Sequence, residues 1–275
     1  MTRASLTVLS LGLILSPYTG VSQESVCSAS ARSVEVPGGD ADVVFFGEVH
    51  GNRESPEVFL AAVCRYLESE DGDVRVALEL PTDVQKDLDR FMVSDGDSEA
   101  VERLRANLFW QRPQVFQDGR SSAAMLDLVK ALRQLGASTR RLVSVTAFDG
   151  VVYPGHTRDA VMAANITSLS QEANDDVVLV LTGDIHARRT PPAGMSDFIP
   201  AASLVEGEIL TILVLPESGD SWNCRATCQS WAVQEVTDLS AYENRVRTAG
   251  SYDYVLPIGG VTSSPPAHGH SEFLE

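Results

Sequence analysis

Two short polar segments each follow an apolar, β-branched run, and this repeated arrangement constrains the fold more than any other feature. Residues 47–50 (Gly-Glu-Val-His) follow 43–46 (Val-Val-Phe-Phe), and residues 183–186 (Gly-Asp-Ile-His) follow 177–181 (Val-Val-Leu-Val-Leu). Runs of this length and composition are typical of parallel strands buried on both faces. Because functional groups gather at the carboxyl ends of such strands, we expect the two acid-x-His pairs to share one edge of one sheet.

Two further apolar runs end in the same way. Residues 74–78 (Val-Arg-Val-Ala-Leu) lead into Glu79, and residues 142–148 lead into Asp149. Any single carboxylate after a strand is also explained as a turn or cap residue. Four strand ends that each present an acid, two of them with a histidine, favour a shared site instead.

Helical patterns alternate with these strands. Apolar spacing and cap residues predict helices that begin at Pro56, Thr82, Ser98, Ser121 and Thr157; the third extends to Trp110, the fourth ends at Gly136 and the fifth extends to Glu172. Further strands are expected at 209–215, 231–236 and 252–256, the last two as edge strands. The alternation predicts an α/β fold with a mostly parallel central sheet flanked by helices and a small C-terminal extension.

The predicted domain boundaries divide the chain into three parts. Residues 1–22 resemble a signal peptide, because Arg3 precedes an apolar stretch at 6–15 that is too short to span a bilayer. We therefore expect no transmembrane anchor and a periplasmic or secreted protein. Residues 23–258 form the predicted α/β domain, and residues 259–275, rich in Gly, Ser and Pro, form a predicted flexible tail.

The four cysteines fit export, because an even number in an oxidising compartment favours disulfides. Cys224 and Cys228 close a short loop and are natural partners, which leaves Cys27 with Cys64. The sequence permits three pairings. A zinc site at the Cys-x3-Cys segment is the alternative, but no histidine lies near it in the sequence.

The formal net charge of −17 indicates which partners are unfavourable. Nucleic acid and anionic membranes both require a basic surface. We therefore expect a small-molecule or peptide substrate, and the sequence leaves open whether the chain forms a homodimer.

The residue types at the strand ends suit two kinds of water activation. In the first, His50, Glu79, Asp184 and His186 hold a divalent zinc, manganese or iron ion with an open position for water. In the second, a histidine held by a carboxylate takes a proton from water, and an arginine or histidine stabilises the oxyanion.

Other charged residues are candidates for substrate contacts. Arg158, at the start of the predicted helix 157–172, suits the oxyanion role, and Arg120, Asp149 and Glu54 are candidate substrate-binding residues. For both arginines the alternative is a salt bridge or a helix-start contact, and Glu54 is also explained as a cap of its helix.

Four segments occur in an order that resembles one protein superfamily. They are residues 47–50, 77–81 (Ala-Leu-Glu-Leu-Pro), 158–166 (which contain Arg-Asp, Met-Ala and Asn-Ile) and 183–187. Together they look like the group that comprises ChaN-like, erythromycin esterase-like and Tiki proteins. The resemblance covers most of the chain from residue 43 to about residue 215.

The resemblance implies different functions for the different branches. Erythromycin esterase-like members hydrolyse an ester, and their catalytic residues match Glu48, His50, Glu79, Arg158 and His186 here. Tiki members are metal-dependent proteases, and ChaN-like members are exported proteins that bind haem. The single residue between Glu48 and His50 looks more ChaN-like.

These observations lead to three functional hypotheses. The first is an exported hydrolase that activates water with Glu and His groups, with or without a divalent metal, and cleaves an ester or amide. The alternative is a ChaN-like protein that binds haem or an iron complex. The third is a degenerate domain that retains the polar cluster only for structure.

Overall fold

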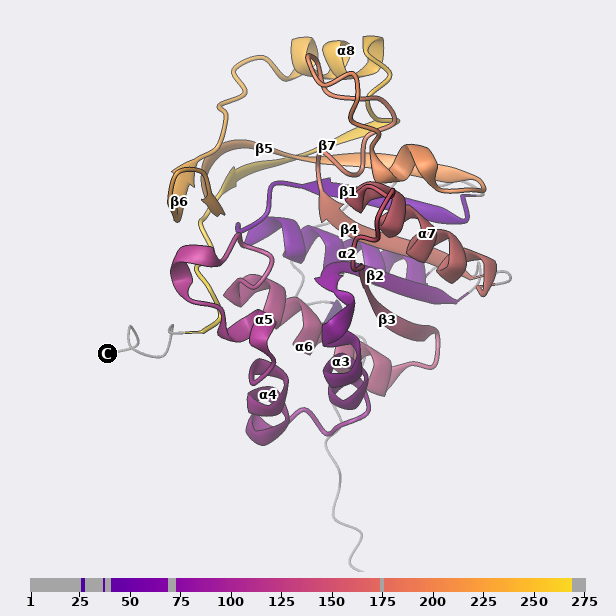
Figure 1. Cartoon of the computed structure of the whole chain (residues 1–275), viewed down its shortest axis with the longest axis vertical. Coiled ribbons are helices and arrows are strands. Elements are labelled where there is room, and N and C mark those ends of the chain that lie inside the picture. The colour runs from indigo at the N-terminus through magenta and orange to yellow at the C-terminus, as the bar shows by residue number, and fades with distance from the viewer. Residues whose placement is uncertain (1–25, 28–36, 38–40, 69–72, 174–175, 269–275) are drawn as a thin grey trace, which may run out of the picture.

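The computed structural model describes residues 26–27, 37, 41–68, 73–173 and 176–268 (Figure 1). The predicted signal peptide, residues 1–22, lies outside the described residues. Among the helices that are described, none is long and apolar enough to cross a membrane.

A mixed sheet forms the centre of the molecule. Its strands follow the order β3-β2-β4-β1-β5-β6, and β7 also pairs with β5. Every pairing is parallel except that of β5 with β6. The predicted α/β class with a mostly parallel sheet is confirmed. The strand bounds are β1 Val43–Glu48, β2 Val74–Pro81, β3 Leu142–Asp149, β4 Val177–Gly183, β5 Ile209–Cys224, β6 Cys228–Ala232 and β7 Tyr254–Val261.

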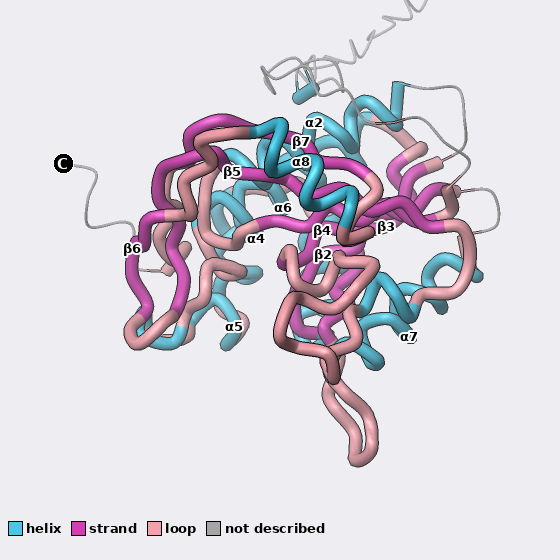
Figure 2. The backbone as a smooth tube through the Cα atoms, turned by 90° about the horizontal axis from the view of Figure 1, so that it is seen from above, coloured by secondary structure: helices cyan, strands magenta, loops and turns pink. Residues whose placement is uncertain are grey.

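Side chains alternate between two apolar cores, one on each face of the sheet. In β1, Val44 and Phe46 belong to one core, and Val43 and Phe45 belong to the other. The first core is covered by α2 (Glu54–Glu68), α3 (Gln85–Met92), α4 (Ser98–Arg105), α5 (Leu108–Gln111) and α6 (Ala123–Ser138). The second is covered by α7 (Arg158–Gln171), with α8 (Leu239–Thr248) packed at its margin (Figures 1 and 2). The apolar runs are strands buried on both faces, as their composition predicts.

Two helix boundaries differ from the prediction. The single helix expected over 98–110 is divided into α4 and α5, because the Asn107 side chain accepts a hydrogen bond from the Phe109 amide (2.9 Å) and starts a new helix. Helix α6 continues past Gly136, where we expected it to end, to Ser138. Gly136 lies within the helix, where a Cβ atom would contact the Met92 side chain at 3.5 Å.

The last third of the chain contains more regular structure than predicted. Strand β5 continues well beyond residue 215, and its second half forms a hairpin with β6. Helix α8 was not predicted; none of its residues is fully buried, and its apolar stripe is limited to Leu239, Tyr242 and Val246, which are partly buried against the second core.

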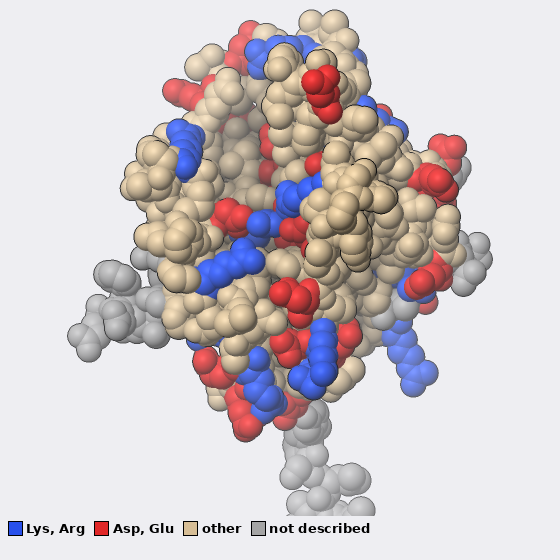
Figure 3. Space-filling view, viewed as in Figure 1, with Lys and Arg blue, Asp and Glu red and all other residues tan. Residues whose placement is uncertain are grey.

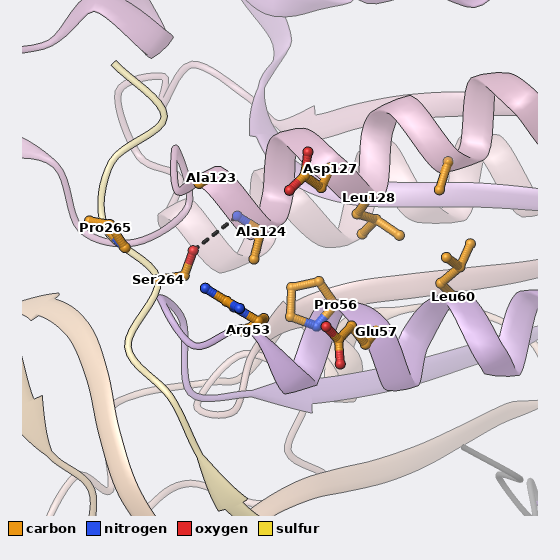
Figure 4. A pocket seen from close by; sticks show the side chains of 11 residues that line it. Arg53, Pro56, Glu57, Leu60, Ala123, Ala124, Asp127, Leu128, Ser264 and Pro265 are labelled. Atoms are coloured by element: carbon orange, nitrogen blue, oxygen red, sulfur yellow. Dashed lines mark hydrogen bonds between the residues drawn. The ribbon is translucent and has the colours of Figure 1, made fainter. Parts of the chain in front are cut away.

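The flexible tail predicted from Gly259 is wrong for residues 259–268. Residues 259–261 complete β7, and the Ser264 hydroxyl accepts a hydrogen bond from the Ala124 amide (2.9 Å). Ser264 and Ala267 are buried against α6, so packing overrides the Gly- and Pro-rich composition. This segment, α2 and α6 line a cavity of about 470 Å³ (Figure 4). Residues 269–275 lie outside the described residues.

All four cysteines are paired, Cys27 with Cys64 and Cys224 with Cys228. This is the pairing that the short Cys224–Cys228 loop favours. Two disulfides fit the oxidising compartment that the sequence predicts.

The two disulfides should differ in what they contribute to stability. Cys27–Cys64 spans a separation of 37 residues, so its loss in a Cys27→Ala/Cys64→Ala variant should lower the free energy of unfolding by about 3–4 kcal/mol. Cys224–Cys228 spans 4 residues, and the corresponding double variant should lose only about 2 kcal/mol. Urea unfolding of the oxidised proteins measures both, and equal losses would contradict the loop-closure explanation.

Candidate active site

The parallel register brings the polar strand ends to one edge of the sheet. Glu48 at the end of β1 pairs with Gly183 at the end of β4, and Asp149 of β3 pairs with Pro81, two residues after Glu79. There they surround a cavity of about 300 Å³. Figure 3 shows acidic and basic side chains gathered in the hollow of this face. The cavity is lined by Glu48, Val49, His50, Glu79, Asp118, Arg120, Arg158, Gly183, Asp184, Ile185, His186, Asn223 and Cys224.

The buried Glu79 carboxylate lies at the centre of the hydrogen-bond network. Its Oε2 accepts hydrogen bonds from the Thr182 hydroxyl (2.6 Å) and the Gly183 amide (2.7 Å) of the neighbouring strand. Its Oε1 accepts one from Arg158 Nη2 (2.6 Å). Burial opposes ionisation, but the charges of His50 and Arg120 outweigh it and hold the pKa of Glu79 well below its usual value. Glu79 is therefore an anion around which the other groups are arranged.

His50 lies between two carboxylates. Its Nδ1 is 3.0 Å from Glu48 Oε1, and its Nε2 is 3.3 Å from Glu79 Oε2. Ionised carboxylates only accept hydrogen bonds, so both ring nitrogens act as donors and the ring is an imidazolium. Burial opposes this charge, but Glu79 and Glu48 overcome it and raise the pKa of His50 to about 10.

His186 has the opposite character because its neighbours are different. Arg158 Nη1 donates to His186 Nε2 (2.7 Å), and a guanidinium has no acceptor, so this nitrogen carries a lone pair. The Nδ1 of His186 donates to Asp159 Oδ1 (2.7 Å), which also accepts from the Ala201 amide (2.9 Å). The geometry therefore assigns a neutral imidazole with its proton on Nδ1.

Two arginines form ion pairs with the carboxylates at this edge of the sheet. Arg158 donates from Nε and Nη2 to both oxygens of Asp149 (2.9 Å each). Arg120 Nη1 also donates to Asp149 (2.7 Å), while its Nε and Nη2 bind Asp118 (3.0 and 2.6 Å to Oδ2). The predicted residues Arg120, Asp149 and Arg158 thus join Glu79 in one charged network.

Asp184 differs from the other carboxylates that line the cavity. Its side chain reaches solvent, and it has no ion pair among the residues that the structure describes. It lies in a concave wall, and this partial removal from water raises its pKa. Asp184 is therefore the carboxylate with most freedom to contact a ligand.

Close packing of glycines fixes the segments that carry His50 and Arg120. Gly51 has a φ of 79° and Gly119 a φ of 89°. A Cβ atom at Gly51 would lie 1.8 Å from the Trp222 carbonyl oxygen, and one at Gly119 would lie 2.5 Å from it. The Trp222 amide donates to the Gly51 carbonyl (2.7 Å) and its indole to the Gln117 carbonyl (3.0 Å). The extension of β5 thus joins both segments at the cavity.

Sequence reasoning missed Asp118 and Asp159 and placed one residue too close to the site. Asp159 follows Arg158 directly, and Asp118 lies two residues before Arg120, so adjacency to a candidate arginine is the signal that could have found them. The structure places Glu54 outside the cavity lining; it accepts a hydrogen bond from the Thr262 amide (2.8 Å). It anchors the C-terminal segment to the start of α2.

The proposed metal ligands do not fit a metal ion in this arrangement. Both His50 nitrogens donate to carboxylates, and the His186 lone pair accepts from Arg158. Within the described ranges, no group of three or more His, Cys, Asp or Glu side chains is placed to hold an ion. The charged walls of the cavity also do not fit the apolar macrocycle of a haem.

Comparison with known proteins gives the fold alone. No protein-family model and no curated protein matches the chain. A succinoglycan biosynthesis protein shares the fold with a TM-score of 0.57 at 11% identity, over 82% of this chain and 90% of that one. A Bacillus cereus protein has a TM-score of 0.54 at 15% identity, over 83% and 90%. An erythromycin esterase EreC variant in its open conformation aligns over 76% of this chain and 80% of its own, with 12% identity and a TM-score of 0.46.

The imidazolium at His50 should make stability depend on alkaline pH. Because the pKa of His50 is raised in the folded state, its contribution is complete below the ordinary value of 6.5 and is lost as the pH rises towards about 10. Urea unfolding from about pH 6 to pH 10 should therefore show a steeper loss of stability for the wild type than for His50→Gln. Parallel profiles would contradict the ion-paired imidazolium.

Proposed function

We propose that this chain is an exported hydrolase that cleaves an ester or amide bond by acid–base catalysis, with His50 as the acid and Asp184 as the base. The observation that carries the proposal is the His50 ring held between Glu48 and Glu79 beside a cavity that also contains Asp184, a carboxylate that forms no ion pair with any described residue. An imidazolium can donate a proton, and a carboxylate without an ion pair among the described residues can accept one, so the two groups are suited to opposite steps of proton transfer.

The reaction begins at Asp184. Its carboxylate takes a proton from a water molecule that attacks the substrate carbonyl. Each guanidinium has five N–H donors, and the described contacts of Arg158 leave one N–H on Nη1 unused. This donor and the neighbouring Arg120 stabilise the negative charge that develops on the carbonyl oxygen.

The second step uses the proton held by His50. The Nε2–H is transferred to the leaving oxygen or nitrogen as the carbonyl–heteroatom bond breaks. Water has then supplied a hydroxyl to the acyl product, and the proton on Asp184 replaces the one that His50 donated. Glu48 and Glu79 favour the return of the imidazolium, because both carboxylates attract its charge.

His186 acts here as a positioning residue. Asp159 fixes its ring, and the ring accepts from Arg158, so it holds the guanidinium towards the cavity. In this assignment Glu48, His50, Glu79, Arg158 and His186 all belong to the site, as the superfamily resemblance implies, and Asp184 is added as the base.

Substitution of the acid and the base tests the proposal. At about pH 7, His50→Gln and Asp184→Asn should each lower kcat by roughly 10²–10⁴-fold on a panel of p-nitrophenyl esters and peptide amides. His268→Gln, at an exposed histidine, is the control for the histidine-to-glutamine change. Asp176→Asn is the control for the aspartate-to-asparagine change; Asp176 lies before β4 and pairs with Arg75 (2.9 Å). Full activity in both site variants would overturn the assignment.

The pH profile separates an acid from a base at His50. If His50 donates a proton, kcat/KM should fall above about pH 10, and it should instead rise towards that pH if His50 must first lose its proton.

Loss of activity with a chelator and recovery with zinc, manganese or iron would replace this mechanism with a metal-dependent one. Saturable haem binding without hydrolysis would favour the ChaN-like alternative.

A further inference from the structure

Two loops that leave the site carry exposed apolar side chains. We infer that these side chains bind an apolar acyl chain or side chain next to the bond that is cleaved. The inference rests on the proposed function and names its substrate class: amphiphilic esters or amides. We call this group the apolar rim; its members are Val151, Val152, Tyr153, Met195 and Ile199.

The strands of the site hold both loops in place. The first loop follows Asp149 and ends at Arg158, so both of its ends belong to the charged network. The second follows His186 and ends at Ala201, whose amide donates to Asp159 (2.9 Å). The Ala202 amide also donates to the His186 carbonyl (3.0 Å). The bases of the two loops therefore meet beside the cavity.

The outer parts of these loops carry few charges. Residues 150–157 contain no charged residue; in the second loop Arg188 and Arg189 lie at its base, and Asp197 is the one charged residue in its outer part, residues 190–200. The rim side chains are 69% (Val151), 50% (Val152), 61% (Tyr153), 45% (Met195) and 53% (Ile199) exposed. Figure 2 shows loops that project from the sheet beside α7, and Figure 3 shows uncharged surface adjoining the charged hollow. Exposed apolar side chains on two loops that start from one site are a candidate binding surface.

Phe198 connects the rim to the catalytic groups. Its ring centroid is 6.2 Å from that of His186, and its side chain is only partly exposed. The loop turns back on itself through hydrogen bonds from the Met195 amide to Pro192 and from the Phe198 amide to Met195 (3.0 Å each). Phe198 therefore places an apolar ring beside His186, in the same turn of the loop as Met195 and next to Ile199 in the chain.

This continuity favours a substrate over a membrane as the occupant. The net charge of −17 opposes an anionic lipid surface. The cavity is lined by ion-paired groups, which suit a carbonyl and its leaving group but offer little surface to a hydrocarbon. A ligand that uses both surfaces has a polar bond in the cavity and an apolar group on the rim.

The length of the acyl chain provides the test. For the wild type, kcat/KM for p-nitrophenyl esters should rise from acetate to octanoate, by up to about fourfold for each methylene that is buried. Met195→Ser/Ile199→Ser and Val151→Ser/Val152→Ser should each lower the octanoate-to-acetate ratio at least about tenfold. Val93→Ser, which changes an 86% exposed valine on another part of the surface, should keep the wild-type ratio.

Failure of this inference can be distinguished from failure of the proposed function. Two results would contradict acyl binding by the apolar rim and leave the proposed hydrolase activity standing. One is hydrolysis of the acetate ester with no dependence of kcat/KM on chain length; the other is an unchanged octanoate-to-acetate ratio in both double variants. If no ester is hydrolysed, calorimetric titration with octanoate and acetate tests the rim without hydrolysis. Selective binding of octanoate that both double variants lose supports binding by the apolar rim. Equal binding of octanoate and acetate overturns it. Rim variants that alter only self-association or vesicle binding also overturn it.

Discussion

The buried Glu79 carboxylate is the constraint on which the site depends. It is 3% exposed, and its two oxygens are bound by groups from β4, from α7 and from the segments that carry His50 and Arg120. A buried charge is tolerated only when it is paired and hydrogen-bonded, and removing one partner of such a pair typically costs about 3–5 kcal/mol. The same requirement holds the imidazolium and two guanidinium groups within one small space. Without the anion, these cations would repel one another.

The fold explains why residues so distant in sequence meet here. Strand β4 lies between β1 and β2, so the ends of these three strands place Glu48, Gly183 and Glu79 side by side. Gly183 leaves room for this convergence, because a Cβ atom there would lie 3.0 Å from His50 Nε2. The long β5 then turns over the same edge, and Trp222 joins the segments on either side of the cavity. The two histidines end in different protonation states because carboxylates surround one and an arginine faces the other.

Local patterns predicted the parallel core and most of the site because they depend on short segments. Continuous apolar runs identify the buried strands, and the acids that follow these strands must share an edge in any parallel sheet. Asp118 binds Arg120 two residues along the chain, so that adjacency could have identified it. The role of Asp159 depends on His186 and Ala201, which the tertiary fold brings close. The same holds for the hydrogen bond from Arg158 to His186, which occupies the nitrogen lone pair that residue types alone assigned to a metal ion. Helix α8 carries only a short apolar stripe, Leu239, Tyr242 and Val246. The packed residues 262–268 lack a periodic pattern, and contacts with distant elements determine their conformation.

The central claim is that His50 is an imidazolium held between two carboxylates, and nitrogen NMR of the isotope-labelled imidazole tests it directly. Both ring nitrogens of His50 should be protonated at about pH 7 and should titrate towards about pH 10. Assignment by comparison with His50→Gln and a His186 variant identifies the signals. A His50 ring that is neutral at about pH 7 would contradict the account, and the acid role in hydrolysis would fail with it.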